Sequence, residues 1–268
     1  FTKNVVKKSG VLMTKIKVIP EWFNHALMSK SICDKINASD QRYHFDTKFN
    51  IMIMGLLTSQ NPEDDRKNLL NTLKWSIETF EGNKNVGIVL KTSLGKSTEF
   101  DNDLCKNVVK ELISRFRKSE FPKVHLIHGN MKSEEIAALY SSSKIKVFAT
   151  ATRGEGYGLP IIDAAASGTP IVATGWSGHF EFLNRELVFD VDYELKQISK
   201  SRVDNAIFLE GFRWAEPDRQ SFCNSLRTVY EDYATAKSKA NKLKKDILKN
   251  YNKTIIKKSY DEIMDVLK

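Results

Sequence analysis

One run, residues 145–170, constrains the fold of this chain more than any other segment. Its apolar beginning at 145–149 predicts a β-strand, and 159–167 predicts a helix. The glycines between them leave room for a tight turn in which no bulky side chain blocks the backbone. Because the N–H groups at a helix N-terminus lack partners, such a turn favours an anion. The three glycines are Gly154, Gly156 and Gly158.

The same run carries two carboxylates, Glu155 and Asp163, eight positions apart. At helical pitch Asp163 lies about one turn into the predicted helix, while Glu155 stands in the turn before it. One acid can therefore reach a ribose, and the other can reach the hydroxyls of a sugar. We expect both to act as hydrogen-bond acceptors rather than metal ligands. The arrangement suits a nucleotide-sugar diphosphate.

Apolar strands alternate with helical stretches through the middle of the chain. This alternation predicts an α/β fold with a doubly wound parallel sheet, whose ligands gather at the carboxyl ends of the strands. Besides the strand at 145–149, we expect strands at 49–57, 86–91, 124–128, 171–173 and 187–191. The helices are expected at 65–80, 103–118, 133–142 and 159–167.

The run from Glu155 to Asp163, read with the segment to Pro170, resembles the Glu-x7-Glu element of retaining GT-B glycosyltransferases of family 4, also called group 1. One departure is Asp163, where the family usually has Glu. Residues 124–140 resemble the strand, base-binding loop and helix that precede this element, and 175–183 resemble the segment after it. Over residues of about 48–190, the chain follows the family's pattern in the same order. The resemblance implies a Rossmann-like C-terminal, donor-binding domain.

The resemblance also implies a reaction and roles for residues. A sugar would pass from a nucleotide diphosphate to an acceptor hydroxyl with retention of configuration, without a metal or other cofactor. Glu155 would orient the donor sugar, and Asp163 would hold the ribose. Backbone at Gly129 and Met131 would frame the base. The remaining donor-binding positions are Gly156, Tyr157, Gly158 and Leu159, at the glycine turn and the helix start.

A diphosphate also needs cations, and Arg66 and Lys67 follow the first strand of the predicted sheet. Arg offers a planar fork and Lys a point charge. The family usually places its first basic residue directly after the strand, where this chain has Gly55-Leu56-Leu57. Arg66 and Lys67 are therefore assigned that role together with Glu155, and Lys91 is a weaker third candidate.

Composition excludes several other classes of protein. The chain has 268 residues, of which 41% are hydrophobic, so it can bury a substantial core. Its three cysteines (Cys33, Cys105, Cys223) are odd in number and widely spaced, which argues against disulfides and structural zinc and favours a reducing, cytoplasmic location. We interpret His125 and His128 as packing residues, and Asp101 and Asp103 as helix caps. No apolar stretch is long enough to span a bilayer.

The net charge of +9 is concentrated near the C-terminus. Residues 237–258 hold nine lysines and one acidic residue. This tail predicts either peripheral contact with an anionic membrane or a solvated lysine-rich helix. Nucleic acid is disfavoured, because aromatic side chains for base stacking are few there.

Domain organisation follows from these elements and from the resemblance. Residues 1–47, with a strand at 15–19 and an irregular stretch at 21–48, would be the end of a missing N-terminal domain and a connector. Residues 48–215 would form the Rossmann-like domain, and 216–268 would be C-terminal helices starting near Pro217 and returning towards the missing domain. The chain begins without Met, so we expect a piece of a longer protein, inactive alone.

Two other functions stay open: a non-catalytic nucleotide-sugar-binding module and a GT-B nucleotide-sugar epimerase. The base, the sugar and the acceptor (glycan, lipid-linked or protein) are not determined by these motifs.

Overall fold

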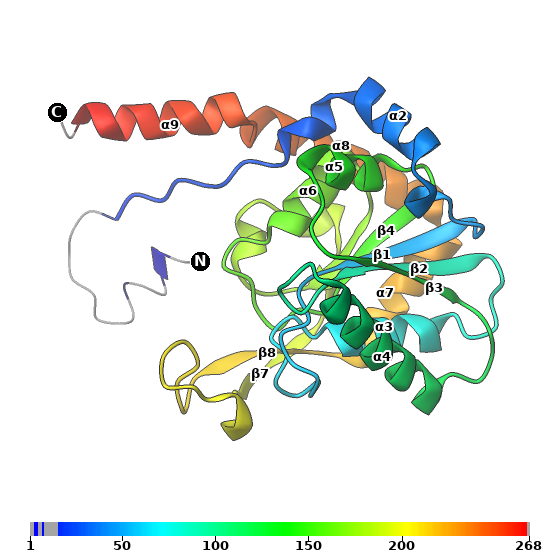
Figure 1. Ribbon diagram of the computed structural model, residues 1–268. Helices are drawn as coiled ribbons and strands as arrows, with labels where there is room; N and C mark the ends of the chain where they lie inside the picture. Colours follow the sequence, from blue (N-terminus) through cyan, green and yellow to red (C-terminus); the bar gives the residue numbers. More distant parts are fainter. Residues whose placement is uncertain (1–2, 5–6, 8–15, 267–268) are drawn as a thin grey trace.

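The fold is organised around a six-stranded sheet, seen in a computed structural model that describes residues 3–4, 7 and 16–266 (Figure 1). The strand order is β3-β2-β1-β4-β5-β6, and every neighbouring pair is parallel. Because the chain winds outwards from β1 in both directions, the predicted doubly wound α/β sheet is confirmed. The strands are β1 (Phe49–Met54), β2 (Val86–Thr92), β3 (Lys123–His128), β4 (Ile145–Thr150), β5 (Ile171–Thr174) and β6 (Phe189–Val191).

Helices cover both faces of this sheet, as its continuous apolar strands require. One face packs against α3 (Leu69–Thr79), α4 (Glu99–Phe116) and α7 (Arg219–Glu231). The other packs against α5 (Ser133–Ser141), α6 (Leu159–Ser167) and α8 (Tyr233–Asn250). The direction of winding reverses between β1 and β4, so their carboxyl ends form the switch point where open α/β sheets bind ligands.

The segment 21–48 is not the irregular connector that the sequence indicated. It contains α2 (Lys30–Ser39) and two short 3-10 helices, η1 (His25–Met28) and η2 (Gln41–Tyr43). Phe23, Tyr43 and Phe45 are buried in the core on the α5 and α6 side of the sheet. Burial of these aromatic rings makes the segment part of the domain. The strand expected at 15–19 is absent from 16–19, and residue 15 lies outside the described residues.

Two helix starts differ from the prediction for local reasons. α3 begins at Leu69 rather than 65, because Asn68 adopts a left-handed conformation and Asp65 accepts the N–H of Leu69 at 2.7 Å. α4 begins at Glu99 rather than 103, with Thr98 as its N-cap. Asp101 is therefore not the cap that we expected; its carboxylate accepts N–H groups from the preceding loop. Asp103 lies inside α4.

A separate antiparallel hairpin was not predicted. It consists of β7 (Tyr193–Gln197) and β8 (Arg213–Pro217) and projects from the carboxyl-end side of the sheet (Figure 1). Pro217 ends β8 rather than opening a helix; α7 begins two residues later, capped by Asp218.

Two more 3-10 helices, η3 (Gly178–Glu181) and η4 (Arg185–Leu187), follow β5, so the strand expected at 187–191 begins at Phe189. A further one, η5 (Lys200–Arg202), lies in the hairpin loop. The strand expected at 49–57 ends at Met54.

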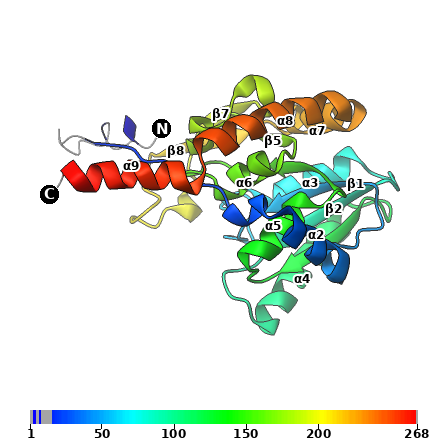
Figure 2. The same ribbon diagram turned by 90° about the horizontal axis from the view of Figure 1, so that it is seen from above.

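The basic tail forms α8 and α9 (Lys253–Val266). α8 packs on α6, and two of its lysines, Lys237 and Lys244, donate to the carbonyl oxygens of Gly168 and Ser167 at the C-terminal end of α6. Cations are favourable there because the helix dipole is negative at that end. α9 extends away from the body in both views (Figures 1 and 2). In the described residues no helix has the length and apolarity to cross a membrane.

Candidate functional site

The glycine turn between β4 and α6 lies at the switch point of the sheet. Gly158 has φ +100° and is the N-cap of α6, a conformation that L side chains rarely adopt. Within the described part of the chain, the amides of Gly156, Tyr157 and Gly158 donate no hydrogen bond. The turn therefore presents free N–H groups at a helix N-terminus, as the spacing of its glycines predicted.

The segment after β5 holds this turn in place. The Ser177 hydroxyl bonds both the N–H and the carbonyl oxygen of Glu155, each at 2.6 Å, and the N–H of Gly178 donates to the same oxygen. A Cβ on Gly178 would lie 2.0 Å from the carbonyl oxygen of Gly156. Only glycine fits so close an approach. The downstream segment that resembled the family element thus fixes the backbone of Glu155.

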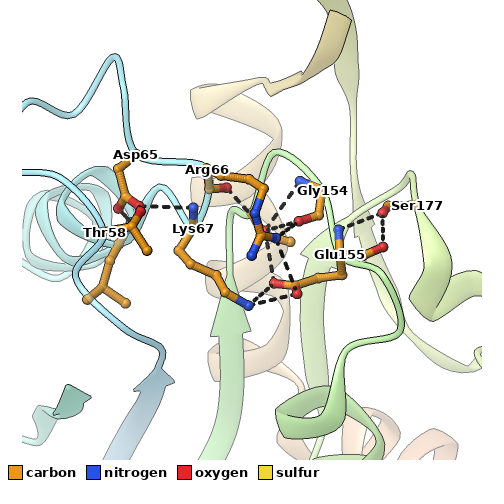
Figure 3. A network of polar contacts seen from close by, with 9 residues as sticks. Thr58, Asp65, Arg66, Lys67, Gly154, Glu155 and Ser177 are labelled. Carbon is orange, nitrogen blue, oxygen red and sulfur yellow. Dashed lines mark hydrogen bonds and ion pairs between the residues drawn. The ribbon is translucent and has the colours of Figure 1, made fainter. Parts of the chain in front are cut away.

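Glu155 meets both predicted cations (Figure 3). The ammonium of Lys67 lies 2.7 Å from each carboxylate oxygen, and Arg66 lies 3.5 Å from one of them. Burial alone would raise the pKa of Glu155, but Lys67, Arg66 and the Thr152 hydroxyl outweigh it and hold the pKa below its ordinary value. Glu155 is therefore an ionised carboxylate that is largely shielded from solvent. Arg66 and Lys67 come from the loop after β1, ahead of α3 rather than in its first turn.

Arg153 is a site residue that sequence reasoning missed. Its side chain is fully buried and makes a two-pronged ion pair with Glu216 of β8, at 2.7 and 2.9 Å. Its guanidinium also donates to the carbonyl oxygens of Pro62 and Asp65 and lies over the Trp214 ring. These bonds join the loop that carries Arg66 and Lys67 to the glycine turn. An arginine two positions before Glu155 was the only signal for it in the sequence.

Asp163 occupies a different environment. It accepts the backbone N–H of Asn24 at 2.7 Å, and burial raises its pKa to about 6. A cavity of about 630 Å³ lies beside it, lined by Asp163, Met131 and Leu159 together with η1 and the residues around it. Three predicted donor-binding residues thus share one cavity. The wall from Trp22 to Ser29 belongs to the segment that the sequence indicated as a connector.

The other predicted residues do not line this cavity. Gly129 has φ +83°, and its carbonyl oxygen accepts a hydrogen bond from Lys91, which is therefore occupied in holding the loop. The Tyr157 hydroxyl donates to the carbonyl oxygen of Glu21 at 2.8 Å, so its side chain contacts the N-terminal segment. Neither Glu155 nor Gly129 lines the cavity.

Two histidines have surroundings that the sequence did not show. His179 is buried beneath the glycine turn, donates through Nε2 to the carbonyl oxygen of Thr174 at 2.9 Å, and burial lowers its pKa. His128 does have acidic and cysteine neighbours, since Asp101 and Cys105 lie beside it. The interpretation of His128 as a packing residue missed these neighbours, because α4 and β3 bring them together only on folding.

Comparison with known families decides where this geometry belongs. Residues 103–254, more than half of the chain, match the family described as family 4 glycosyltransferases in conflict systems. The chain belongs to this family. The matched region includes β3 to α8, with the glycine turn and both carboxylates, whereas Arg66 and Lys67 lie before it. No curated protein matches the chain.

Solved structures show the same fold. HepE from Anabaena, in complex with UDP and glucose, is 15% identical over 98% of this chain, with a TM-score of 0.66. Sucrose-phosphate synthase from Thermosynechococcus elongatus is 16% identical over 99%, with a TM-score of 0.68. This family 4 chain spans only 60% and 56% of those two chains.

A third structure comes from a part of a glycosyltransferase. The C-terminal domain of LpcC, a group 1 family protein from Francisella tularensis, is 16% identical over 88% of this chain, with a TM-score of 0.54. This chain covers 96% of that solved domain. At these identities the likeness concerns the GT-B glycosyltransferase fold, of which this chain has one Rossmann-like domain with C-terminal helices.

Proposed function

We propose that this chain is the donor-binding half of a retaining glycosyltransferase that takes a sugar from a nucleotide diphosphate sugar. The observation that carries the proposal is the glycine turn: three amides that have no hydrogen-bond partner among the described residues lie at the N-terminus of α6, and Arg66 and Lys67 contact Glu155 of the same turn. Amides, helix dipole and cations together stabilise the negative charge that a leaving diphosphate gains as the glycosidic bond breaks.

The nucleoside part of the donor fits the cavity beside Asp163. The carboxylate of Asp163 accepts the ribose hydroxyls, and the backbone of Gly129 and Met131 frames the base. Met131 and Asp163 line this cavity of about 630 Å³, a volume in the range of nucleotide-sized sites. Asp in place of the family's usual Glu shortens the arm by one methylene, and one oxygen of Asp163 accepts the backbone N–H of Asn24, which leaves the other oxygen for the ribose.

The sugar lies on the other side of the diphosphate, beside Glu155. Its ionised carboxylate accepts hydrogen bonds from the sugar hydroxyls and fixes the anomeric carbon relative to the acceptor. Lys67 neutralises that carboxylate and adds positive charge near the leaving group. The amides and cations carry the charge stabilisation, so transfer proceeds without a metal.

The second half of the active site comes from an N-terminal domain. α9 extends away from the body (Figure 2) and leaves Tyr260 and Met264 exposed, two large apolar side chains one turn apart on the same face of the helix. An uncovered apolar helix face is typical of a surface that packs against another domain. The acceptor binds on that missing half, so the isolated chain binds nucleotide without transferring sugar.

The decisive experiment is calorimetric titration of the chain with UDP, GDP, ADP and CMP, with and without EDTA. One diphosphate is expected to bind at one site, and at about 100 times its dissociation constant it adds about 2.7 kcal/mol to folding stability. Lys67→Met is expected to weaken binding at least tenfold, whereas the surface control Lys74→Met leaves it unchanged. Absence of binding by all four nucleotides contradicts the proposal.

Transfer itself is tested on the chain joined to its N-terminal half. A labelled donor is expected to give a retained anomeric configuration in the product, read by NMR, and to be insensitive to EDTA. Release of an isomerised sugar without an acceptor indicates an epimerase instead. Nucleotide binding without either reaction indicates a binding module.

A further inference from the structure

Three potential metal ligands meet away from the glycine turn, where α4 begins beside the end of β3. Asp101 and Cys105 are one helical turn apart on α4, and His128 is the last residue of β3. One ligand atom from each lies within 4.8 Å of the other two. Among the described residues, no other group of three or more His, Cys, Asp or Glu side chains comes so close together.

The two distances that involve Asp101 are close to those of a tetrahedral zinc site. With Zn–S of about 2.3 Å and Zn–N or Zn–O of about 2.0–2.1 Å, a tetrahedron has an S···O edge of about 3.6 Å and an N···O edge of about 3.4 Å. Cys105 Sγ lies 3.6 Å from Asp101 Oδ1, and His128 Nε2 lies 3.6 Å from the same oxygen. The side chains already stand at ligand spacing.

Burial and hydrogen bonding suit a fixed centre. Cys105 is fully buried and Asp101 is 4% exposed. Backbone N–H groups of Leu94 and Lys96 donate to the two oxygens of Asp101, at 2.9 and 2.8 Å, and so orient the carboxylate as outer-shell partners of metal sites do. The His128 Nε2 atom is buried and has no hydrogen-bond partner among the described residues. A bound cation would give this nitrogen the partner it lacks.

We propose that Asp101, Cys105 and His128 bind a divalent transition-metal ion of the zinc type, with water as the fourth ligand. The mixed S, N and O set is one that Zn²⁺ accepts. On binding, the S–H bond of Cys105 breaks, a metal–thiolate bond forms, and the proton passes to solvent. The thiolate and the Asp101 carboxylate then balance the two positive charges.

The expected role of this centre is structural. It ties the start of α4 to the end of β3, directly before the Gly129–Met131 loop. The N–H of Asn130 already donates to the Ser97 hydroxyl at 2.7 Å, so the two loops are in contact. A metal there stiffens both loops without touching the glycine turn. The inference rests on this cluster alone and stands whether or not the chain binds a nucleotide.

Cobalt titration of metal-free protein tests the proposal. One equivalent of Co²⁺ is expected to bind and to give the near-ultraviolet thiolate charge-transfer band and the visible bands of a tetrahedral site; Zn²⁺ displaces it. One equivalent of Zn²⁺ is also expected to raise the melting temperature of the metal-free protein. A folded chain that gives no thiolate band and no zinc-dependent shift overturns the proposal and identifies a hydrogen-bonded cluster.

Variants locate the site. Cys105→Ser and His128→Gln are expected to abolish the thiolate band and lower zinc affinity at least 100-fold. The control Cys223→Ser replaces a buried cysteine that is not part of this group. It is expected to retain the thiolate band and the zinc affinity. If a variant of a proposed metal ligand fails to fold, cobalt titration of the unaltered chain still decides whether the metal binds. A band that persists in Cys105→Ser also overturns the assignment.

Discussion

The backbone N–H of Asn24 donates to the carboxylate of Asp163 at 2.7 Å, which joins residues 139 positions apart in the sequence. This bond holds the N-terminal segment against α6 beside the cavity. The bond favours the ionised form of the carboxyl, but burial prevails, so the pKa of Asp163 rises from 3.8 to about 6.

The raised pKa of Asp163 predicts a stability cost at neutral pH. A carboxyl with a folded pKa above its unfolded value contributes stability below about pH 4, and that contribution is lost as the pH rises through 6. Asp163→Asn, which keeps the acceptor for Asn24, is expected to be more stable than the unaltered chain by about 1–3 kcal/mol at pH 7 and equal at pH 4.

Urea unfolding at the two pH values measures this difference. Asp246→Asn, at an exposed position on α8, is the control and is expected to change stability little at either pH. Nucleotide affinity of Asp163→Asn is expected to fall, because an amide donates as well as accepts. Equal stability of Asp163→Asn and the unaltered chain at pH 7 contradicts the buried-charge argument.

The pair of Lys67 and Glu155 predicts the opposite pH dependence. Because the pKa of Glu155 is held below its ordinary value of 4.5, its stabilisation is present at neutral pH and lost as the pH falls below that value. Lys67→Met leaves the 10% exposed carboxylate with Arg66 at 3.5 Å and the Thr152 hydroxyl at 3.1 Å, and is expected to cost about 2–3 kcal/mol at pH 7.

Denaturant unfolding across pH 3–7 is the measurement. The matched control is Lys74→Met, which removes an exposed lysine 3.9 Å from Glu78 and is expected to cost under about 1 kcal/mol. Removing Glu155 as well, in Lys67→Met with Glu155→Gln, is expected to restore part of the loss. A cost no larger than that of the control argues against a buried pair.

Arg153 predicts a coupling between stability and donor binding. Arg153→Met removes the partner of Glu216 and the donor to the carbonyl oxygen of Pro62, whereas the carbonyl oxygen of Asp65 keeps the N–H of Asn68, so we expect a loss of about 3 kcal/mol. Arg153→Lys keeps the charge but loses the two-pronged geometry. Its stability is expected to lie between that of the unaltered chain and that of Arg153→Met. The control is Arg219→Met, on an exposed pair with Glu78, with a loss under about 1 kcal/mol.

Nucleotide titration separates positioning from stability. Arg153→Lys, at a temperature where it is fully folded, is expected to bind the diphosphate more weakly and to leave affinity for the nucleoside unchanged, because only the loop carrying Arg66 and Lys67 shifts. Equal losses for nucleoside and diphosphate point to a general loss of structure instead.

Gly178 predicts a steric effect on the glycine turn. Gly178→Ala places a methyl group 2.0 Å from the Gly156 carbonyl oxygen, which forces the two loops apart and is expected to cost about 2 kcal/mol or more. Gly156→Ala, whose added Cβ meets nothing within 4 Å, is the stability control. Thermal unfolding of the two variants measures the difference; similar melting temperatures contradict the close approach.

Local patterns predicted much of the domain. Period and composition located all six strands of the sheet to within a few residues, and α6 was predicted at its observed bounds, because glycines delimit it at both ends. Glu155, Arg66 and Lys67 were assigned to one site, since parallel strands of one sheet end at a common edge, but the ion pairs among them were not predicted. Contacts that depend on side-chain packing were missed: the wall at Trp22–Ser29, the Arg153 bonds and the surroundings of His128.

The sequence by itself determined a strand, a glycine turn and a helix with two acids at set positions, because backbone sterics and helical pitch act over a few residues. Only the tertiary structure decided which partners those acids meet. Lys67 reaches Glu155 across 88 positions, and Asn24 reaches Asp163 across 139. Such pairings follow from the order of strands in the sheet and from what packs over them, and no local period encodes that order.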